Sequence, residues 1–206
     1  MTAAADYFTG AYFSQFHTKK YQNSNPFQRK QISKLLGRVV ELARPLQPKS
    51  IIDAGGGEGF LTGYLAHEFP QAQMTVVDFS AQDLGYLKQR LPRVETVEGN
   101  LETFDLGRKV DLLVATEVLE HLRDARAALK RFVTHADRII VTVPNEPIFM
   151  LTNFLRGKNL ARLGNDAEHI NHWNPASLKR FLSRELEVDT VEAIFPWIVA
   201  SGHRRA

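Results

Sequence analysis

The sequence predicts an α/β fold, with a seven-stranded, mostly parallel sheet and helices on both faces. Two observations lead to this prediction. Short apolar runs alternate with segments of helical periodicity, which is typical of parallel sheets built from strand, helix and strand in succession. The first apolar run ends in an acidic residue and is followed by a glycine-rich turn, Ala54 to Gly59, as expected where a strand passes to a helix beside a ligand.

The elements follow one another in a simple order. Residues 1–49 are expected to form an aromatic arm, either irregular or made of short helices, and then a helix, because apolar residues recur at helical spacing from Phe27 to Leu42. The aromatic residues of the arm could belong to the core or to a lid. The strands 110–115 and 138–143 are almost uniformly apolar, as expected of strands covered on both faces. The predicted strands are 50–53, 74–78, 94–97, 110–115, 138–143, 187–194 and 197–201, with only the last antiparallel, and the helices between them are 60–69, 81–91, 123–133 and 175–184.

The regular alternation breaks between residues 144 and 174. So long an insertion predicts a substrate lid within a single domain that comprises residues 1–206. The insertion begins with an apolar patch followed by Arg156 and Lys158, which could be core or could rest on a membrane surface as a peripheral contact. The patch consists of Ile148, Phe149, Met150, Leu151, Phe154 and Leu155.

Composition excludes several classes of function. The chain of 206 residues has no cysteine, which excludes disulfide scaffolds, zinc ribbons, iron–sulfur sites and thiol nucleophiles. Its net charge of +3 is small, so nucleic acid is an unlikely partner. No apolar run approaches the roughly 20 residues of a spanning helix. We therefore expect a cytoplasmic protein, and the composition leaves its oligomeric state open.

Two acidic residues frame the glycine turn. Asp53 closes the first strand, and Asp78 closes the second strand 25 residues later, at the spacing where a carboxylate can accept the hydroxyls of a ribose. A carboxylate at residue 53 would repel a pyrophosphate but attract a cationic amine, which favours S-adenosylmethionine over a dinucleotide. A tight turn without a ligand is the structural alternative.

The segment Ile51-Ile-Asp-Ala-Gly-Gly-Gly-Glu-Gly59 resembles the first motif of class I S-adenosylmethionine-dependent methyltransferases of the small-molecule type, and the likeness runs from about Ser50 to the end of the chain. The resemblance implies a Rossmann-like fold, glycines beside the methionine part, Asp53 near its amine and Asp78 on the ribose. Asn100 stands where the family usually has an aspartate that contacts the adenine. The cofactor-binding residues implied are Asp53, Ala54, Gly55, Gly56, Gly57, Asp78, Phe79, Asn100, Leu101 and Thr116.

A second cluster follows the fourth predicted strand. Glu117, Glu120 and His121 are spaced i, i+3 and i+4 and would share one face of a helical turn, which the family places beside the sulfonium. Three interpretations remain open: the residues cap and orient the turn, His121 acts as a general base, or all three bind Mg²⁺ or another divalent metal. His169 and His172 in the predicted lid are further catalytic candidates, although ordinary packing before the helix at Pro175 competes.

This pattern is similar in part to ubiquinone-pathway O-methyltransferases and more fully to small-RNA 2′-O-methyltransferases, but the Phe-Arg-Pro-Pro motif of the RNA enzymes is absent. The expected function is therefore methylation of a small-molecule or lipid-like acceptor by a transferase, with O-methylation favoured. The alternatives are a metal-dependent 2′-O-methyltransferase of RNA and a cofactor-binding interaction domain without catalysis.

Overall fold

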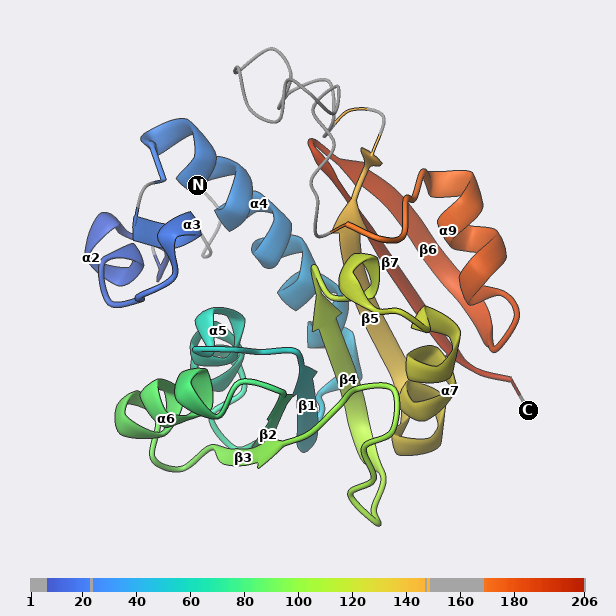
Figure 1. Ribbon diagram of the computed structural model, residues 1–206, viewed down its shortest axis with the longest axis horizontal. Coiled ribbons are helices and arrows are strands. Elements are labelled where there is room, and N and C mark those ends of the chain that lie inside the picture. The colour runs from blue at the N-terminus through green and yellow to red at the C-terminus, as the bar shows by residue number, and fades with distance from the viewer. Residues whose placement is uncertain (1–6, 23, 147, 149–168, 206) are drawn as a thin grey trace.

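The computed structural model describes residues 7–22, 24–146, 148 and 169–205, and they include the predicted seven-stranded sheet (Figure 1). The strand order is β3-β2-β1-β4-β5-β7-β6. Only β7 is antiparallel to its neighbours, β5 and β6, which confirms the predicted mostly parallel sheet. The strands are β1 (Ser50–Ala54), β2 (Gln73–Asp78), β3 (Glu95–Glu98), β4 (Val110–Thr116), β5 (Ala136–Pro144), β6 (Leu186–Ile194) and β7 (Trp197–Arg204).

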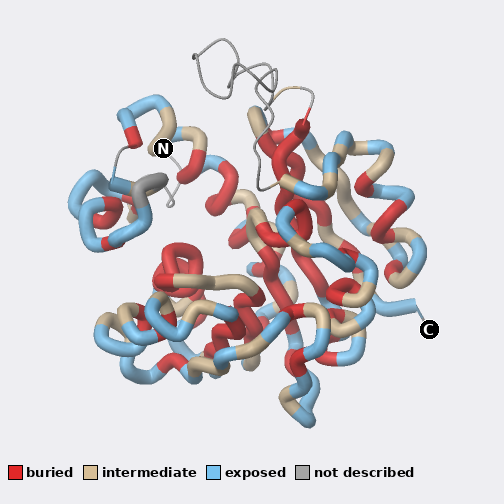
Figure 2. The backbone as a smooth tube through the Cα atoms, in the orientation of Figure 1, coloured by how far each residue is buried: buried red, intermediate tan, exposed pale blue. Residues whose placement is uncertain are grey.

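Alternate residues of the central strands face two separate hydrophobic cores. Ile51 belongs to one core and Ile52 to the other, because successive side chains of a strand point to opposite faces of the sheet. The red, buried stretches of Figure 2 accordingly follow the strands, whereas the outer turns of the helices are pale blue. Helices α4 (Pro26–Ala43), α5 (Phe60–Glu68) and α6 (Ala81–Arg90) contribute to the first core, and α7 (Ala125–His135) and α9 (Pro175–Leu182) to the second.

Helices α4 and α9 begin close to the predicted residues because capping side chains precede them. Asn25 accepts a hydrogen bond from the backbone of Gln28, whose side chain in turn accepts one from the Asn25 backbone. Asn174 and Ser177 form the same reciprocal arrangement at the start of α9. Each cap precedes a proline at the first helical position, where no backbone N–H is needed.

The N-terminal arm is part of the core. It contains two short helices, α2 (Gly10–Phe13) and α3 (Lys19–Gln22), and most of its aromatic side chains are buried. They surround Phe60 at the start of α5: the ring of Phe8 stacks on Phe60 at 5.3 Å, and the Tyr12 hydroxyl donates to the Phe60 carbonyl at 2.6 Å. This packing fixes the arm against the carboxyl end of the sheet. A 3₁₀ helix, η1 (Arg44–Leu46), connects α4 to β1.

Most of the predicted lid lies outside the described residues. Of the apolar patch, only Ile148 is described, so the suggested peripheral membrane contact stays a prediction. Among the helices that the structure does describe, none combines the length and the apolar character that crossing a bilayer requires.

Two glycines, one with open space around it and one tightly packed, provide a test of the packing. Gly85 is exposed within α6 and an added Cβ would meet nothing within 4 Å, so Gly85→Ala is expected to raise the free energy of unfolding by about 0.5–1 kcal/mol. A Cβ on Gly202 in β7 would lie 2.7 Å from the Glu187 carbonyl oxygen, so Gly202→Ala is expected to lower it by about 1–3 kcal/mol. Urea unfolding of both variants measures the two effects, and equal shifts would contradict this packing.

Candidate functional site

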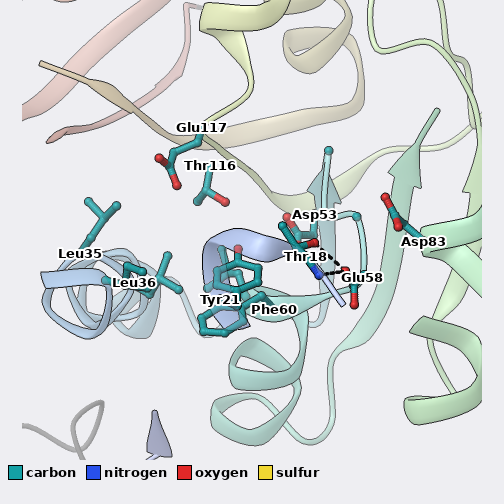
Figure 3. A pocket seen from close by; sticks show the side chains of 15 residues that line it. Thr18, Tyr21, Leu35, Leu36, Asp53, Glu58, Phe60, Asp83, Thr116 and Glu117 are labelled. Atoms are coloured by element: carbon teal, nitrogen blue, oxygen red, sulfur yellow. Dashed lines mark hydrogen bonds between the residues drawn. The ribbon is translucent and has the colours of Figure 1, made fainter. Parts of the chain in front are cut away.

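A pocket lies at the carboxyl ends of β1 and β4, where the glycine turn, the arm and α4 meet (Figure 3). In the figure, Asp53, Glu58 and Thr18 lie on one side, and Leu35 and Leu36 lie on the other. Five residues that were predicted to bind the cofactor line this pocket: Asp53, Gly55, Gly56, Gly57 and Thr116.

Asp53 is the most deeply buried acid of the pocket, with only 1% of its surface exposed. Thr62 Oγ1 donates to Asp53 Oδ2 at 2.6 Å, while Oδ1 has no hydrogen-bond partner among the described residues. Burial raises the pKa of Asp53 to about 6; the Thr62 hydrogen bond opposes this shift and the nearby charge of Asp78 adds to it. A cation placed beside this carboxyl would therefore stabilise its ionised form.

Asp78, at the end of β2, holds the glycine turn from the other side. Its Oδ2 accepts a hydrogen bond from the Gly57 backbone at 2.8 Å, and its Oδ1 accepts one from the Ser80 backbone at 2.9 Å. Burial raises the pKa of Asp78 above its usual value, and these hydrogen bonds counteract part of that rise. The next side chain, Phe79, is 83% exposed, as a ring that covers a bound ligand can be in the free protein.

At Gly55 and Gly56 the turn leaves no room for a side chain. A Cβ on Gly56 would lie 2.9 Å from both Asp53 Oδ2 and Val76 Cγ1, and Gly55 and Gly57 have φ of 75° and 51°. Such positive φ values favour glycine. The backbone of the turn can therefore approach a ligand closely.

The other predicted cofactor residues lie around the turn without lining the pocket. Ala54 and Leu101 are buried, and Asn100 is exposed. Asn100 Oδ1 accepts a hydrogen bond from the Glu102 backbone at 2.8 Å, which fixes the side chain within its own loop. Their contacts with a cofactor stay predictions.

The predicted helical face of the second cluster is not observed. Glu117 has a left-handed backbone with φ of 55°, and only η2 (Leu119–His121) is helical, as a short 3₁₀ turn. Glu117 consequently lines the pocket, and its Oε1 accepts a hydrogen bond from Trp197 Nε1 at 2.7 Å. Glu120 is instead fully buried.

A group of potential metal ligands forms next to the pocket. Single ligand atoms of Glu120, His121 and His169 all lie within 4.8 Å of one another. His169 Nδ1 also contacts Glu146 Oε1 at 2.6 Å, and a carboxylate in this position orients an imidazole that binds metal through its other nitrogen. Glu117 is not part of this group, and His172 Nδ1 lies 3.8 Å from Glu146 Oε2.

Backbone contacts bring His169 to η2. The N–H groups of Ile170 and Asn171 donate to the Glu120 carbonyl at 2.8 and 3.0 Å, and the Asn171 side chain donates to the carbonyls of Leu119 and Leu122. The end of the predicted lid therefore attaches to the segment that carries Glu120 and His121.

A family model described as a methyltransferase domain matches residues 27–186, more than half of the chain. The chain belongs to this methyltransferase family. Its sheet has the Rossmann-like topology of class I methyltransferases, as the sequence predicted. The matched range includes the glycine turn, residues 117–121 and the predicted lid histidines at 169 and 172, and it ends at the first residue of β6.

Curated relatives that the chain matches are also methyltransferases. Trans-aconitate 2-methyltransferase from Azoarcus sp. strain BH72 is 34% identical over 86 residues, or 42% of this chain and 34% of that protein. Malonyl-(acyl-carrier protein) O-methyltransferase from Halalkalibacterium halodurans is 31% identical over 111 residues, or 50% of this chain and 41% of that protein. The chain thus spans less than half the length of these curated relatives.

A solved structure shares the fold over nearly the whole chain. Magnesium protoporphyrin IX methyltransferase from Synechocystis PCC 6803, solved with bound S-adenosylhomocysteine, has a TM-score of 0.70 at 20% identity and is matched over 97% of both chains.

Sequence reasoning missed four residues that shape the site: Thr18, Glu58, Glu146 and Trp197. Glu58 stands within the glycine motif and Glu146 follows β5 directly, so their positions at strand ends were a usable signal. Trp197 reaches Glu117 from 80 residues away, and no local pattern predicts such a contact.

The buried carboxyl of Asp53 predicts a pH-dependent cost in stability. Because its pKa is about 6 in the folded protein and the ordinary pKa of an aspartate is 3.8, the unfolded chain loses this proton first. The contribution of Asp53 to the free energy of unfolding therefore falls by about 3 kcal/mol as the pH rises from about 4 to about 7. Urea unfolding of the wild type and of Asp53→Asn across this range measures the difference. A stability difference that stays constant with pH would refute the assignment.

Proposed function

We propose that the protein transfers the methyl group of S-adenosylmethionine to a hydroxyl group of a small-molecule or lipid-like acceptor. The observation that carries this proposal is a pocket in a methyltransferase fold that buried Asp53 lines together with Gly55, Gly56 and Gly57, while Asp78 accepts a hydrogen bond from the backbone of the same turn. The S-adenosylhomocysteine bound to the cyanobacterial relative supports the same cofactor here.

Each group around the turn suits one part of this cofactor. The carboxylate of Asp53 would face the positively charged amine, and the charge attraction offsets the cost of burying the acid. Asp78 would accept the ribose hydroxyls, since a carboxylate has further acceptor sites beyond the two backbone N–H groups that it already binds. Phe79 would cover the adenine.

The opposite side of the pocket suits an acceptor with an apolar body. Leu35 and Leu36 of α4 line that side, and the carboxylate of Glu117 also lines the pocket. A hydroxyl can donate a hydrogen bond to a carboxylate, whereas an anionic acceptor would be repelled by it. This lining supports O-methylation of a neutral, partly apolar molecule.

The reaction itself needs alignment more than activation. S-adenosylmethionine would supply an activated methyl group, which would pass from its sulfur to the acceptor oxygen while the hydroxyl proton passes to a base. His121 is exposed and follows Glu117, which lines the pocket, by four residues, and an imidazole in this position would take that proton. Holding donor and acceptor in line supplies much of the rate enhancement.

The group of Glu120, His121 and His169 fits a divalent metal ion. One carboxylate and two imidazoles form a mixed oxygen and nitrogen donor set, which suits a transition metal better than Mg²⁺. A metal bound there would lower the pKa of the acceptor hydroxyl. Glu146 would orient His169, and His172 would contact Glu146 from the solvent side; Glu117 as a further ligand stays a prediction.

Calorimetric titration with S-adenosylhomocysteine tests the cofactor assignment. We expect binding by the wild type and a loss of about tenfold or more in affinity for Asp78→Asn, because a charged hydrogen-bond acceptor is removed. Asp137→Asn, which changes an exposed aspartate paired with Lys109, serves as the matched control and should bind normally. Failure of the wild type to bind would overturn the proposal and favour an interaction domain without catalysis.

Titration with Mn²⁺ and Mg²⁺ tests the metal site. We expect Mn²⁺ to bind more tightly than Mg²⁺, and His169→Ala to weaken Mn²⁺ binding by about tenfold or more. His203→Ala is the matched control, because His203 pairs with Asp189 in the outer strands. Equal Mn²⁺ binding by the wild type and His169→Ala would show that Mn²⁺ does not bind at this site. Glu120, His121 and His169 would then have a structural role.

A further inference from the structure

Glu58 stands in the glycine turn but directs its carboxylate toward the arm. The side chain is almost fully buried, and each of its oxygens accepts a hydrogen bond from an arm residue. Figure 3 shows the contact with Thr18. Oε1 accepts from the Thr18 backbone at 2.7 Å and from Thr18 Oγ1 at 2.5 Å. Oε2 accepts from the His17 backbone at 2.6 Å and lies 3.2 Å from His17 Nδ1.

A carboxylate is the side chain that these contacts require. Three of the four are N–H or O–H donors aimed at one group, and an ionised carboxylate is the acceptor-only side chain that can satisfy them all. Burial alone would raise the pKa of Glu58, but the hydrogen bonds from Thr18 and His17 outweigh it and keep the pKa below its usual value. Glu58 is therefore ionised at neutral pH.

The segment held by Glu58 forms one wall of the cofactor pocket. Thr18 and Tyr21 line the same pocket as Asp53 and the glycines. The ring of Tyr21 stacks on Phe60 at 3.8 Å with an interplanar angle of 9°. Movement of residues 17–21 away from the turn would open this wall.

A second side chain ties the arm to the same turn. Arg90 of α6 donates to the carbonyls of Glu58 and Gly59, and its guanidinium lies 4.1 Å from the centre of the Phe16 ring. The His17 ring also stacks on Tyr86 of α6 at 3.9 Å. These contacts converge on the part of the arm next to the pocket.

We propose that Glu58 is a positioning residue that holds the arm, residues 7–22, over the cofactor pocket, and that the cofactor exchanges when this contact breaks. The inference rests on the proposed function, since it assumes that the pocket binds S-adenosylmethionine. Glu58, a residue of the glycine motif, would then help to close the site as well as to shape the turn.

The experiment compares Glu58→Gln with Glu68→Gln in the full chain. Glutamine keeps the shape of the side chain but directs its N–H group at the donors of Thr18 and His17, which weakens the hold on the arm. We therefore expect S-adenosylhomocysteine to dissociate about tenfold or more faster. Trypsin should also cleave the ligand-free variant faster at Lys19 or Lys20. Glu68 on α5 accepts a hydrogen bond from Arg44 at 2.6 Å outside the pocket, so Glu68→Gln should change neither rate.

The readouts separate this proposal from the proposed function. Unchanged dissociation and unchanged cleavage in Glu58→Gln would overturn the role of Glu58. If the wild type binds no S-adenosylhomocysteine, the proposed function fails, while the cleavage rates of the ligand-free proteins still test whether Glu58 holds the arm. Should Glu58→Gln not fold, Thr18→Val removes one donor and retains the bulk, and it must accelerate both rates for the role to stand.

Discussion

The absence of a side chain at Gly55 and at Gly56, in the turn after β1, is the constraint on which the site depends. Gly56 packs directly against Asp53 and Val76, and the positive φ values of Gly55 and Gly57 bend the backbone away from β1. Because these glycines carry no side chains, acids can lie close to the turn: the Asp53 carboxylate lies against Gly56, Asp78 accepts a hydrogen bond from the Gly57 backbone, and Glu58 belongs to the turn itself. Each of these acids has different hydrogen-bond partners.

Two close acids, Asp53 and Asp78, are unfavourable for the ligand-free fold and favourable for a cationic ligand. Burial and, to a smaller extent, the charge of Asp78 raise the pKa of Asp53, whereas hydrogen bonds hold the pKa of Glu58 below its usual value. Backbone N–H groups stabilise Asp78, and arm donors stabilise Glu58. Asp53 has only the Thr62 hydroxyl, so its charge is the one that a bound cation would stabilise most. The charge of Asp53 therefore lowers the stability of the ligand-free fold at the position where a cationic ligand would bind.

The sequence predicted the sheet and the glycine turn because both depend on local patterns. Apolar runs, helical periodicity and the caps at Asn25 and Asn174 are encoded within a few residues of each element. The direction of Glu117 was missed, since its left-handed backbone arises from the hydrogen bond of its N–H to the Thr142 carbonyl and from the distant Trp197. The partnership of Glu146 with His169 likewise depends on how the chain returns to η2.

The central claim is that one pocket, closed by the arm, holds S-adenosylmethionine over the glycine turn. A crystal structure of the protein with S-adenosylhomocysteine tests it most directly. The account predicts the ribose hydroxyls on Asp78, the amine beside Asp53, and Thr18 still bound to Glu58 over the ligand. A ligand bound elsewhere, or one in this pocket without contact to Asp78, would contradict it.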